Sequence, residues 1–293
     1  MTAFLPPLVS VLMPTRNQSS FISESIESVL SQNYTNLELI VLDGASTDKT
    51  HVTLKRIAAQ DERLSWFSAP DTGPAQAINK GLSKVKGTII GWLNSDDLYS
   101  EGAIERVVAK FQDDRNLLMV YGEGLNVDEL GTFVSRYPTL PANTPIDTFN
   151  EGCFICQPTV FFRRTLNLLL GPLDESLKTA FDFDYWLKAF KKVQGRIGFI
   201  PHEQAMIRLH GATITANNRK AVMLEGMQIL NRHLGYSPNN WVLTYIDECM
   251  QRSDLGKGTV REMIFSFFEE ARPFLSSHDQ TMMQQRLISL MAE

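Results

Sequence analysis

The sequence predicts an α/β protein with a mostly parallel, Rossmann-like sheet that is flanked by helices. Apolar runs rich in β-branched residues alternate with helical stretches between residues 9 and 93. The links between these elements are short, and three of the apolar runs end in acidic or polar loops. Such alternation is typical of βαβ units, in which crossover helices cover both faces of a parallel sheet.

The first elements follow directly from this pattern. Val9–Met13 is an apolar strand that ends at Pro14, and the helix after it has apolar residues on one face at Ile22, Ile26, Val29 and Leu30. Further along the chain we expect strands at 37–42 and 64–67, helices at 49–60 and from residue 71 onward, and a strand at 88–93.

Beyond residue 101 the alternation becomes irregular. The expected elements are a helix at 104–111, a strand at 118–121, a hairpin at 127–133, a strand at 160–162, a helix at 184–192 and a strand at 205–210. From about residue 237 the pattern is helical throughout. We therefore expect one α/β domain over residues 1–232 and a C-terminal helical extension over residues 233–293.

Composition and charge restrict the class of protein. The chain has 293 residues, of which 43% are hydrophobic and 21% charged, as in an ordinary globular protein. A formal net charge of -5 argues against nucleic acid as a partner. Three cysteines form no disulfide framework. No apolar run is long enough to span a membrane, and the N-terminus lacks a signal-peptide pattern. We expect a cytoplasmic protein, with peripheral contact at the inner face of the membrane left open.

The most informative segment is the polar turn Asn94–Asp97, which follows the strand expected at 88–93. In α/β proteins, ligands bind at the carboxyl ends of the strands. Asp96 and Asp97 are adjacent carboxylates that repel each other unless they share a cation, and hard divalent cations prefer oxygen ligands. The alternative is an ordinary turn in which Asp caps a helix. The residues of the turn alone leave both interpretations open.

Several segments, taken in order, resemble the family-2 inverting glycosyltransferases, which have the GT-A fold. The matching segments are Val9–Asn17, Ser28–Gln32, Leu42–Asp48, Ala77–Gly81, Gly91–Asp97 and Asp182–Leu187. The resemblance covers about residues 8–232, and the ordered set is more specific than any one segment. It implies an enzyme that moves a sugar from a nucleoside-diphosphate sugar to an acceptor hydroxyl.

The resemblance also implies roles for individual residues. Asp97 would bind Mn²⁺ or Mg²⁺ through the diphosphate, Asp96 would meet the ribose or a metal-bound water, and Asp182 would be the general base for the acceptor hydroxyl. The expected donor-binding residues are Pro14, Thr15, Asn17, Asp43, Asp71, Asn94, Ser95 and Asp96.

These roles have structural alternatives, and the family pattern is not complete. Asp182 could simply cap a helix, and Asp43 could be a turn residue. Gly44 stands where the family often has a second acid that reads uracil, and Phe181 stands where the acidic motif often begins with Glu. We still expect a UDP-sugar donor, and we assign the general base to Asp182 alone.

Arg208 and His210 follow the last expected strand of the α/β domain. A cation at Arg208 is suited to a diphosphate, so we include it among the donor-binding residues. His210 is a candidate for an additional metal ligand. The alternative is a hydrogen-bonded structural histidine, which is the more common role of a lone His.

The predicted function is therefore a metal-dependent inverting glycosyltransferase of polysaccharide biosynthesis, acting on a glycan or lipid-linked acceptor. A metal on the leaving-group side and one carboxylate on the acceptor side suffice for inversion in a single displacement. A nucleotidyltransferase is one alternative, but it would be expected to carry a Gly- and Lys-rich loop, and Pro14–Gln18 contains neither residue. A carbohydrate- or nucleotide-binding module without turnover is the second alternative, and the presence of Asp182 disfavours it.

Overall fold

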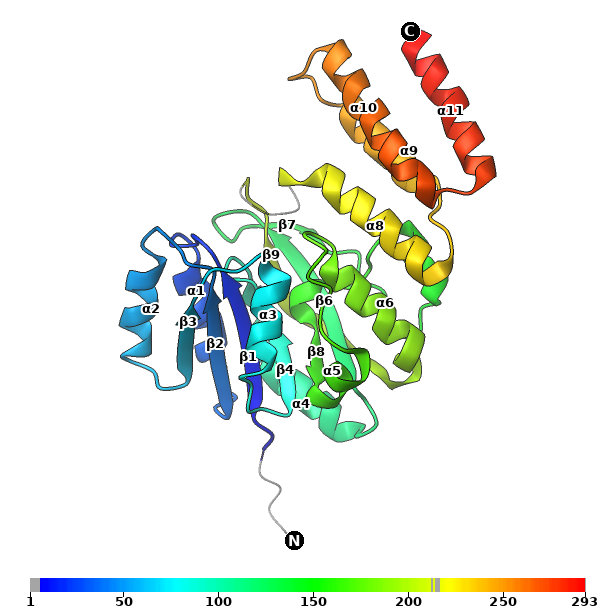
Figure 1. Cartoon of the computed structure of the whole chain (residues 1–293). Helices are drawn as coiled ribbons and strands as arrows, with labels where there is room; N and C mark the ends of the chain where they lie inside the picture. The colour runs from blue at the N-terminus through cyan, green and yellow to red at the C-terminus, as the bar shows by residue number, and fades with distance from the viewer. Residues whose placement is uncertain (1–5, 212, 214–216, 293) are drawn as a thin grey trace. The chain divides into compact units, whose positions relative to one another are not determined.

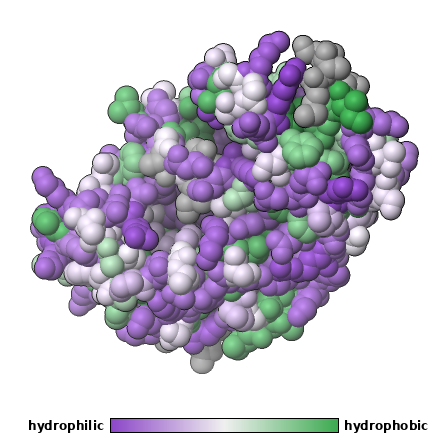
Figure 2. Space-filling view, turned by 45° about the horizontal axis from the view of Figure 1, so that its top comes forward, coloured by the Kyte–Doolittle hydropathy of each residue, from purple (hydrophilic) through white to green (hydrophobic). Residues whose placement is uncertain are grey.

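A computed structural model describes residues 6–211, 213 and 217–292, and the chain divides into two compact units. Unit 1 comprises Met1–Thr144 and Phe154–His210, and unit 2 comprises Pro145–Cys153 and Gly211–Glu293. Unit 1 contains the sheet, as the sequence predicts, and unit 2 is helical (Figure 1). Among the described residues, no helix is long and apolar enough to cross a membrane. On the face drawn in Figure 2, hydrophilic residues predominate and hydrophobic residues gather in separate patches.

The strands of unit 1 form one sheet. Their bounds are β1 (Val9–Thr15), β2 (Leu37–Asp43), β3 (Leu64–Ser68), β4 (Ile89–Trp92), β5 (Leu98–Tyr99), β6 (Met119–Val127), β7 (Phe133–Arg136), β8 (Phe161–Arg163) and β9 (Ile197–Arg208). The spatial order is β3-β2-β1-β4-β8-β6-β9-β5, and β7 pairs with β6. Strands β1 to β4 pair in parallel, as predicted, whereas β8 is antiparallel to both β4 and β6.

The helices of unit 1 are α1 (Ile22–Leu30), α2 (Thr50–Ala58), α3 (Pro74–Leu82), α4 (Ala103–Asp113), α5 (Arg164–Leu170) and α6 (Phe181–Val193). The core on one face of the sheet includes buried side chains from α1 and α4, and the positions predicted for the first helix, Ile22, Ile26 and Val29, are all buried there. Figure 1 shows α3 and α6 in front of the sheet, so helices cover both of its faces. This arrangement leaves the carboxyl ends of β1, β2 and β4 at one edge of the sheet.

Gly91 lets β4 pack closely against its neighbours just before the acidic turn. A Cβ atom at this position would lie 2.5 Å from the Phe161 ring and 2.7 Å from the Tyr99 hydroxyl. We therefore expect Gly91→Ala to lower the free energy of unfolding by about 1–3 kcal/mol through overpacking, as measured by urea denaturation. Gly195→Ala is the control, because no atom lies within 4 Å of its added Cβ. Equal effects at both positions would contradict this packing argument.

Unit 2 is built on its own hydrophobic cluster. Its helices are α8 (Arg219–Leu234), α9 (Asn240–Met250), α10 (Lys257–Ala271) and α11 (Ser277–Ala292). Tyr245 and Phe267 stack with ring centroids 4.0 Å apart, and Met223 and Met227 of α8 belong to the same cluster. The domain boundary expected after residue 232 thus falls inside α8, and the structural division precedes that helix. A hydrogen bond of 2.7 Å from the Trp241 indole to the Asn150 carbonyl joins Pro145–Cys153 to these helices.

Candidate active site

Asp96 and His210 lie together at the carboxyl edge of the sheet. Asp96 is in the turn after β4, and His210 follows β9, which runs beside β6 and β5. His210 Nε2 is 3.0 Å from Asp96 Oδ2, and the imidazole packs on the Phe21 ring with centroids 4.7 Å apart. The His210 side chain is 3% exposed and the Asp96 side chain 16%. The structure therefore joins two residues that the sequence separates by more than a hundred positions.

Asp97 points into the protein and is held there by protein donors. Its Oδ1 accepts a hydrogen bond from the Arg208 amide at 3.1 Å, and its Oδ2 accepts one from Asn94 Nδ2 at 3.2 Å. Burial, followed by the negative charge of Asp96, raises the pKa of Asp97 well above its ordinary value. The sequence assigned the metal to Asp97, but the carboxylate beside His210 belongs to Asp96. The turn therefore directs the Asp97 side chain inward and the Asp96 side chain toward His210.

Within residues 6–211, 213 and 217–292, no group of three or more His, Cys, Asp or Glu side chains is arranged to hold a metal ion. Asp96 and His210 offer a carboxylate oxygen and an imidazole nitrogen, which are both donors that divalent metals accept. Sites for Mg²⁺ commonly use only one or two protein carboxylates and take further ligands from substrate phosphates. The donor set thus fits a metal that is completed by a diphosphate.

Arg208 is occupied by protein acceptors. Its Nε donates to the Asp96 carbonyl at 3.0 Å, its Nη1 to the Glu129 carbonyl at 2.6 Å, and its Nη2 to the Glu24 carboxylate at 2.7 Å. The side chain is 2% exposed, and its guanidinium lies over the Phe21 ring. Through these bonds Arg208 fixes the turn that carries Asp96, and its contact with a diphosphate stays a prediction.

Asn94 belongs to a network that connects the turn to α6. It accepts a hydrogen bond from the Trp92 indole at 3.2 Å, and its amide donates to Gln157 Oε1 at 3.0 Å. Gln157 in turn donates to the Trp92 carbonyl at 2.8 Å. The Trp92 ring stacks on Phe181, the first residue of α6, at a centroid distance of 5.3 Å. These contacts hold the N-terminus of α6 against the strand that leads to the acidic turn.

Asp182 is the second residue of α6 and follows the stacked Phe181 directly. Its Oδ1 accepts a hydrogen bond of 2.8 Å from the Phe183 amide. A carboxylate in the first turn of a helix is stabilised by the positive end of the helix dipole. Asp184, which lies in the same turn, is fully buried and pairs with Lys188 at 2.6 Å. The two acids of this motif therefore differ, and Asp182 is the one that is partly exposed.

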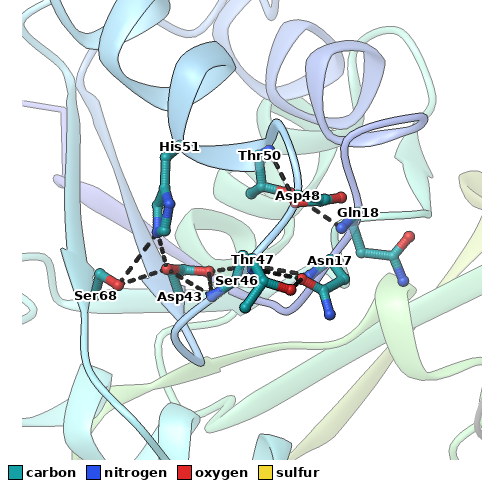
Figure 3. Close-up of polar contacts among 9 residues, drawn as sticks. All are labelled: Asn17, Gln18, Asp43, Ser46, Thr47, Asp48, Thr50, His51 and Ser68. Atoms are coloured by element: carbon teal, nitrogen blue, oxygen red, sulfur yellow. Dashed lines mark hydrogen bonds and ion pairs between the residues drawn. The ribbon is translucent and has the colours of Figure 1, made fainter.

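Asp43 is the centre of a closed hydrogen-bond network at the end of β2 (Figure 3). Its carboxylate accepts bonds from Ser46 Oγ at 2.5 Å, from Ser68 Oγ at 2.6 Å and from His51 Nε2 at 2.7 Å. Burial alone would raise the pKa of Asp43, but the hydrogen bonds from Ser46, Ser68 and His51 outweigh it, so the pKa is lowered. Asp43 is thus an ionised anchor for the loop after β2.

Hydrogen bonds connect the loops after β1 and β2. Asn17 has a left-handed backbone with φ 54°, and its side-chain oxygen accepts a bond from the Thr47 amide at 2.8 Å (Figure 3). The Gly44 amide donates to the Thr15 carbonyl at 2.9 Å. Pro14 and Ser95 are buried, and the Ser95 carbonyl accepts a bond from Ser25. Most of the expected donor residues therefore gather at one edge of the sheet.

Sequence reasoning missed several residues that support this edge. His51 and Ser68 complete the Asp43 network, and Glu24 neutralises Arg208. Each comes from a different element of secondary structure than its partner. No local pattern marks such residues, because they are polar side chains of ordinary helices and strands.

Comparisons with known proteins give a consistent identity. A family model, "Glycosyl transferase family 2", matches residues 10–167. The chain is 28% identical over 218 residues to an uncharacterized glycosyltransferase of Haemophilus influenzae, covering 74% of this chain and 85% of the relative. It is 30% identical over 257 residues to a chondroitin synthase of Escherichia coli, covering 83% of this chain but only 35% of that relative.

Solved structures with a similar fold bind nucleotide sugars. S. aureus TarS 1-349 in complex with UDP-GlcNAc has a TM-score of 0.60 at 18% identity, over 92% of this chain and 73% of that one. The mannosyltransferase PcManGT from Pyrobaculum calidifontis, in complex with GDP-Man and Mn²⁺, has a TM-score of 0.60 at 16% identity, over 98% and 81%. At these identities the likeness shows the fold, which is of the GT-A type. The chain therefore belongs to glycosyl transferase family 2, and it is a glycosyltransferase rather than a nucleotidyltransferase or a binding module without turnover.

Proposed function

We propose that this glycosyltransferase is metal-dependent and inverting, and that it moves a sugar from a UDP-sugar to a hydroxyl of a glycan or a lipid-linked acceptor. The observation that carries the proposal is the contact between Asp96 and His210 at the edge of the sheet where the expected donor residues gather. A cation held there would neutralise the negative charge that grows on the leaving diphosphate. Contact with a membrane surface stays a prediction from the sequence.

Asp96 and His210 would hold the cation, Mn²⁺ or Mg²⁺, from the protein side. His210 is oriented for this by its packing on Phe21, and Arg208 fixes the backbone of the acidic turn through the Asp96 carbonyl. Both supports reduce the freedom of the ligands before the donor binds. Preorganised ligands of this kind lose less conformational entropy on binding, which favours affinity.

Asp182 would accept the proton of the acceptor hydroxyl. It is partly exposed, and the stacking of Phe181 on Trp92 fixes it relative to the acidic turn. A carboxylate that removes this proton as the hydroxyl attacks contributes typically about 10²–10⁴-fold to the rate. With one base on the acceptor side, the hydroxyl can attack opposite the departing diphosphate, which inverts the anomeric configuration in a single step. No carboxylate nucleophile is required.

The choice of a UDP-sugar is supported by relatives of the same fold. TarS has been crystallised with UDP and with UDP-GlcNAc, although PcManGT was crystallised with GDP-Man. A screen of UDP, GDP, CDP and TDP by thermal shift, each with and without Mn²⁺, distinguishes these donors. We expect UDP to raise the Tm more than the other nucleotides do, and more with Mn²⁺ than without it. At a hundredfold excess over its Kd, a ligand stabilises by about 2.7 kcal/mol, which raises the Tm by about 5–11 °C in a domain of this size.

Turnover is then measured with the matching nucleotide sugar and a panel of glycan acceptors. We expect an α-linked donor to give a β-linked product, and the configuration is read from the anomeric proton coupling by NMR. Retention of configuration would exclude the single displacement. Failure of all four nucleotides to shift the Tm, with or without metal, would count against a nucleotide-sugar donor altogether.

A further inference from the structure

We propose that Asp71, and not Asp43, reads the base of the nucleotide donor, and that this base carries a hydrogen on its ring nitrogen, as uracil does at N3. This inference rests on the proposed function, since it concerns how the site chooses among nucleoside diphosphates. It deepens that function by naming the residue that determines the choice. Three features of the loops after β1, β2 and β3 support it.

The Asp43 carboxylate has no capacity left for a ligand. It accepts hydrogen bonds from four donor groups: the Ser46 amide at 3.1 Å, Ser46 Oγ at 2.5 Å, Ser68 Oγ at 2.6 Å and His51 Nε2 at 2.7 Å. An ionised carboxylate offers about four lone-pair sites. The Asp43 side chain is also 0% exposed. A base could reach it only by breaking one of these buried bonds, so Asp43 positions the loop and does not contact the nucleotide (Figure 3).

The Asp71 carboxylate stands where a side chain at position 44 would project. A Cβ atom at Gly44 would lie 2.7 Å from Asp71 Oδ2. Among the described residues, the one hydrogen-bond donor to Asp71 is the Gly73 amide, which binds Oδ1 at 3.0 Å. Oδ2 therefore keeps its acceptor capacity, and Asp71 is only partly buried. Because Gly44 has no side chain, the Asp71 carboxylate, which follows β3, can lie close to the loop after β2.

Thr15, whose backbone is bonded to Gly44, carries a second polar group. Its side-chain oxygen is buried and has no hydrogen-bond partner among the described residues, and its carbonyl accepts the Gly44 amide at 2.9 Å. Buried hydroxyls nearly always have a partner, so this one is suited to a ligand. A hydroxyl that can donate and a carboxylate that accepts are the groups that a uracil edge, with its alternating carbonyl and N–H groups, requires.

The charge of Asp71 then decides which bases fit. An ionised carboxylate only accepts hydrogen bonds, so it pairs with the N3–H of uracil but faces a lone pair on N3 of cytosine. A hydrogen bond to a charged group corresponds to about 10- to 100-fold in affinity. We therefore expect the wild-type chain, with Mn²⁺ present, to bind UDP about 10- to 100-fold more tightly than CDP.

The decisive variant is Asp71→Asn, examined by calorimetry with UDP and CDP in the presence of Mn²⁺. Asn can still accept the Gly73 amide, and its own amide can either accept or donate at the base, so the UDP/CDP ratio should fall to within about threefold of unity. Asp43→Asn is the comparison variant. It should weaken both nucleotides together and leave their ratio at the wild-type value, because it disturbs the loop without touching the base.

The opposite pattern would overturn the inference: Asp43→Asn erasing the ratio while Asp71→Asn preserves it. A further measurement uses the wild-type chain alone, so its result does not depend on whether the variants fold. UDP methylated at N3 should bind about 10- to 100-fold more weakly than UDP, and equal binding would also overturn the inference. If the wild-type chain bound no nucleoside diphosphate at all, the proposed function itself would fail, and that result is distinct from an unchanged ratio.

Discussion

Asp182→Asn is expected to lower kcat by about 10²- to 10⁴-fold while the affinity for UDP and Mn²⁺ stays within about twofold of the wild-type value. The amide has the shape of the carboxylate but cannot take the proton of the acceptor hydroxyl. Asp182 lies at the start of α6 and is not part of the turn that carries Asp96 and His210, so donor binding should not depend on its charge. Steady-state kinetics with calorimetry of UDP binding measures both quantities.

Asp113→Asn is the matched control for this experiment. Asp113 is an exposed carboxylate at the end of α4, and its substitution should leave both kcat and UDP affinity unchanged. If Asp182→Asn lowered UDP affinity along with the rate, Asp182 would belong to the donor side of the site. A rate within tenfold of wild type would remove it as the general base.

Asp96→Asn and His210→Ala are each expected to weaken the Mn²⁺-dependent binding of UDP by about 100-fold or more. Even residues that merely support a metal ligand typically cost about 10- to 100-fold when they are changed, and these two are proposed as the ligands themselves. Binding of UDP in EDTA should be the same in both variants as in the wild-type chain, since the contacts to the base are untouched. Titration of UDP with and without Mn²⁺ gives the comparison.

Asp97→Asn tests which of the two carboxylates of the turn binds the metal. Asp97 is bound by the Arg208 amide and by Asn94, so this variant should reduce stability by breaking the bond from Asn94. The gain in UDP affinity that Mn²⁺ produces should persist. The reverse outcome, in which Asp97→Asn loses the metal response and Asp96→Asn keeps it, would restore the assignment made from the sequence.

The sequence was a reliable guide to the first half of the sheet. The strands that end near Met13, Leu42 and Leu93 are short apolar runs with amphipathic helices between them, and local periodicity is enough to predict a parallel arrangement. The insertion of β8 between β4 and β6 could not be predicted. Pairing of strands so distant in sequence depends on packing of the whole sheet, which no local pattern records.

In the site, too, the sequence predicted the local motifs but not the contacts between residues that are distant in the chain. The motif order located the acidic turn and Asp182, because the family resemblance preserves sequence order. It assigned the metal to Asp97 and the ribose to Asp96, but it could not show where these neighbouring side chains point. That direction is set by the Arg208 amide and by His210, which lie at the far end of β9. Likewise, the saturation of Asp43 depends on His51 and Ser68, from α2 and β3.

Asp96 and His210 are proposed to hold a divalent cation at the donor diphosphate. A crystal structure of the wild-type chain with UDP and Mn²⁺, with the metal located by its anomalous scattering, tests this most directly. We predict one strong anomalous peak within about 2.5 Å of both a carboxylate oxygen of Asp96 and Nε2 of His210, and bridging to the diphosphate. A peak bound to Asp97, or UDP bound in full occupancy with no anomalous peak at the diphosphate, would contradict the claim.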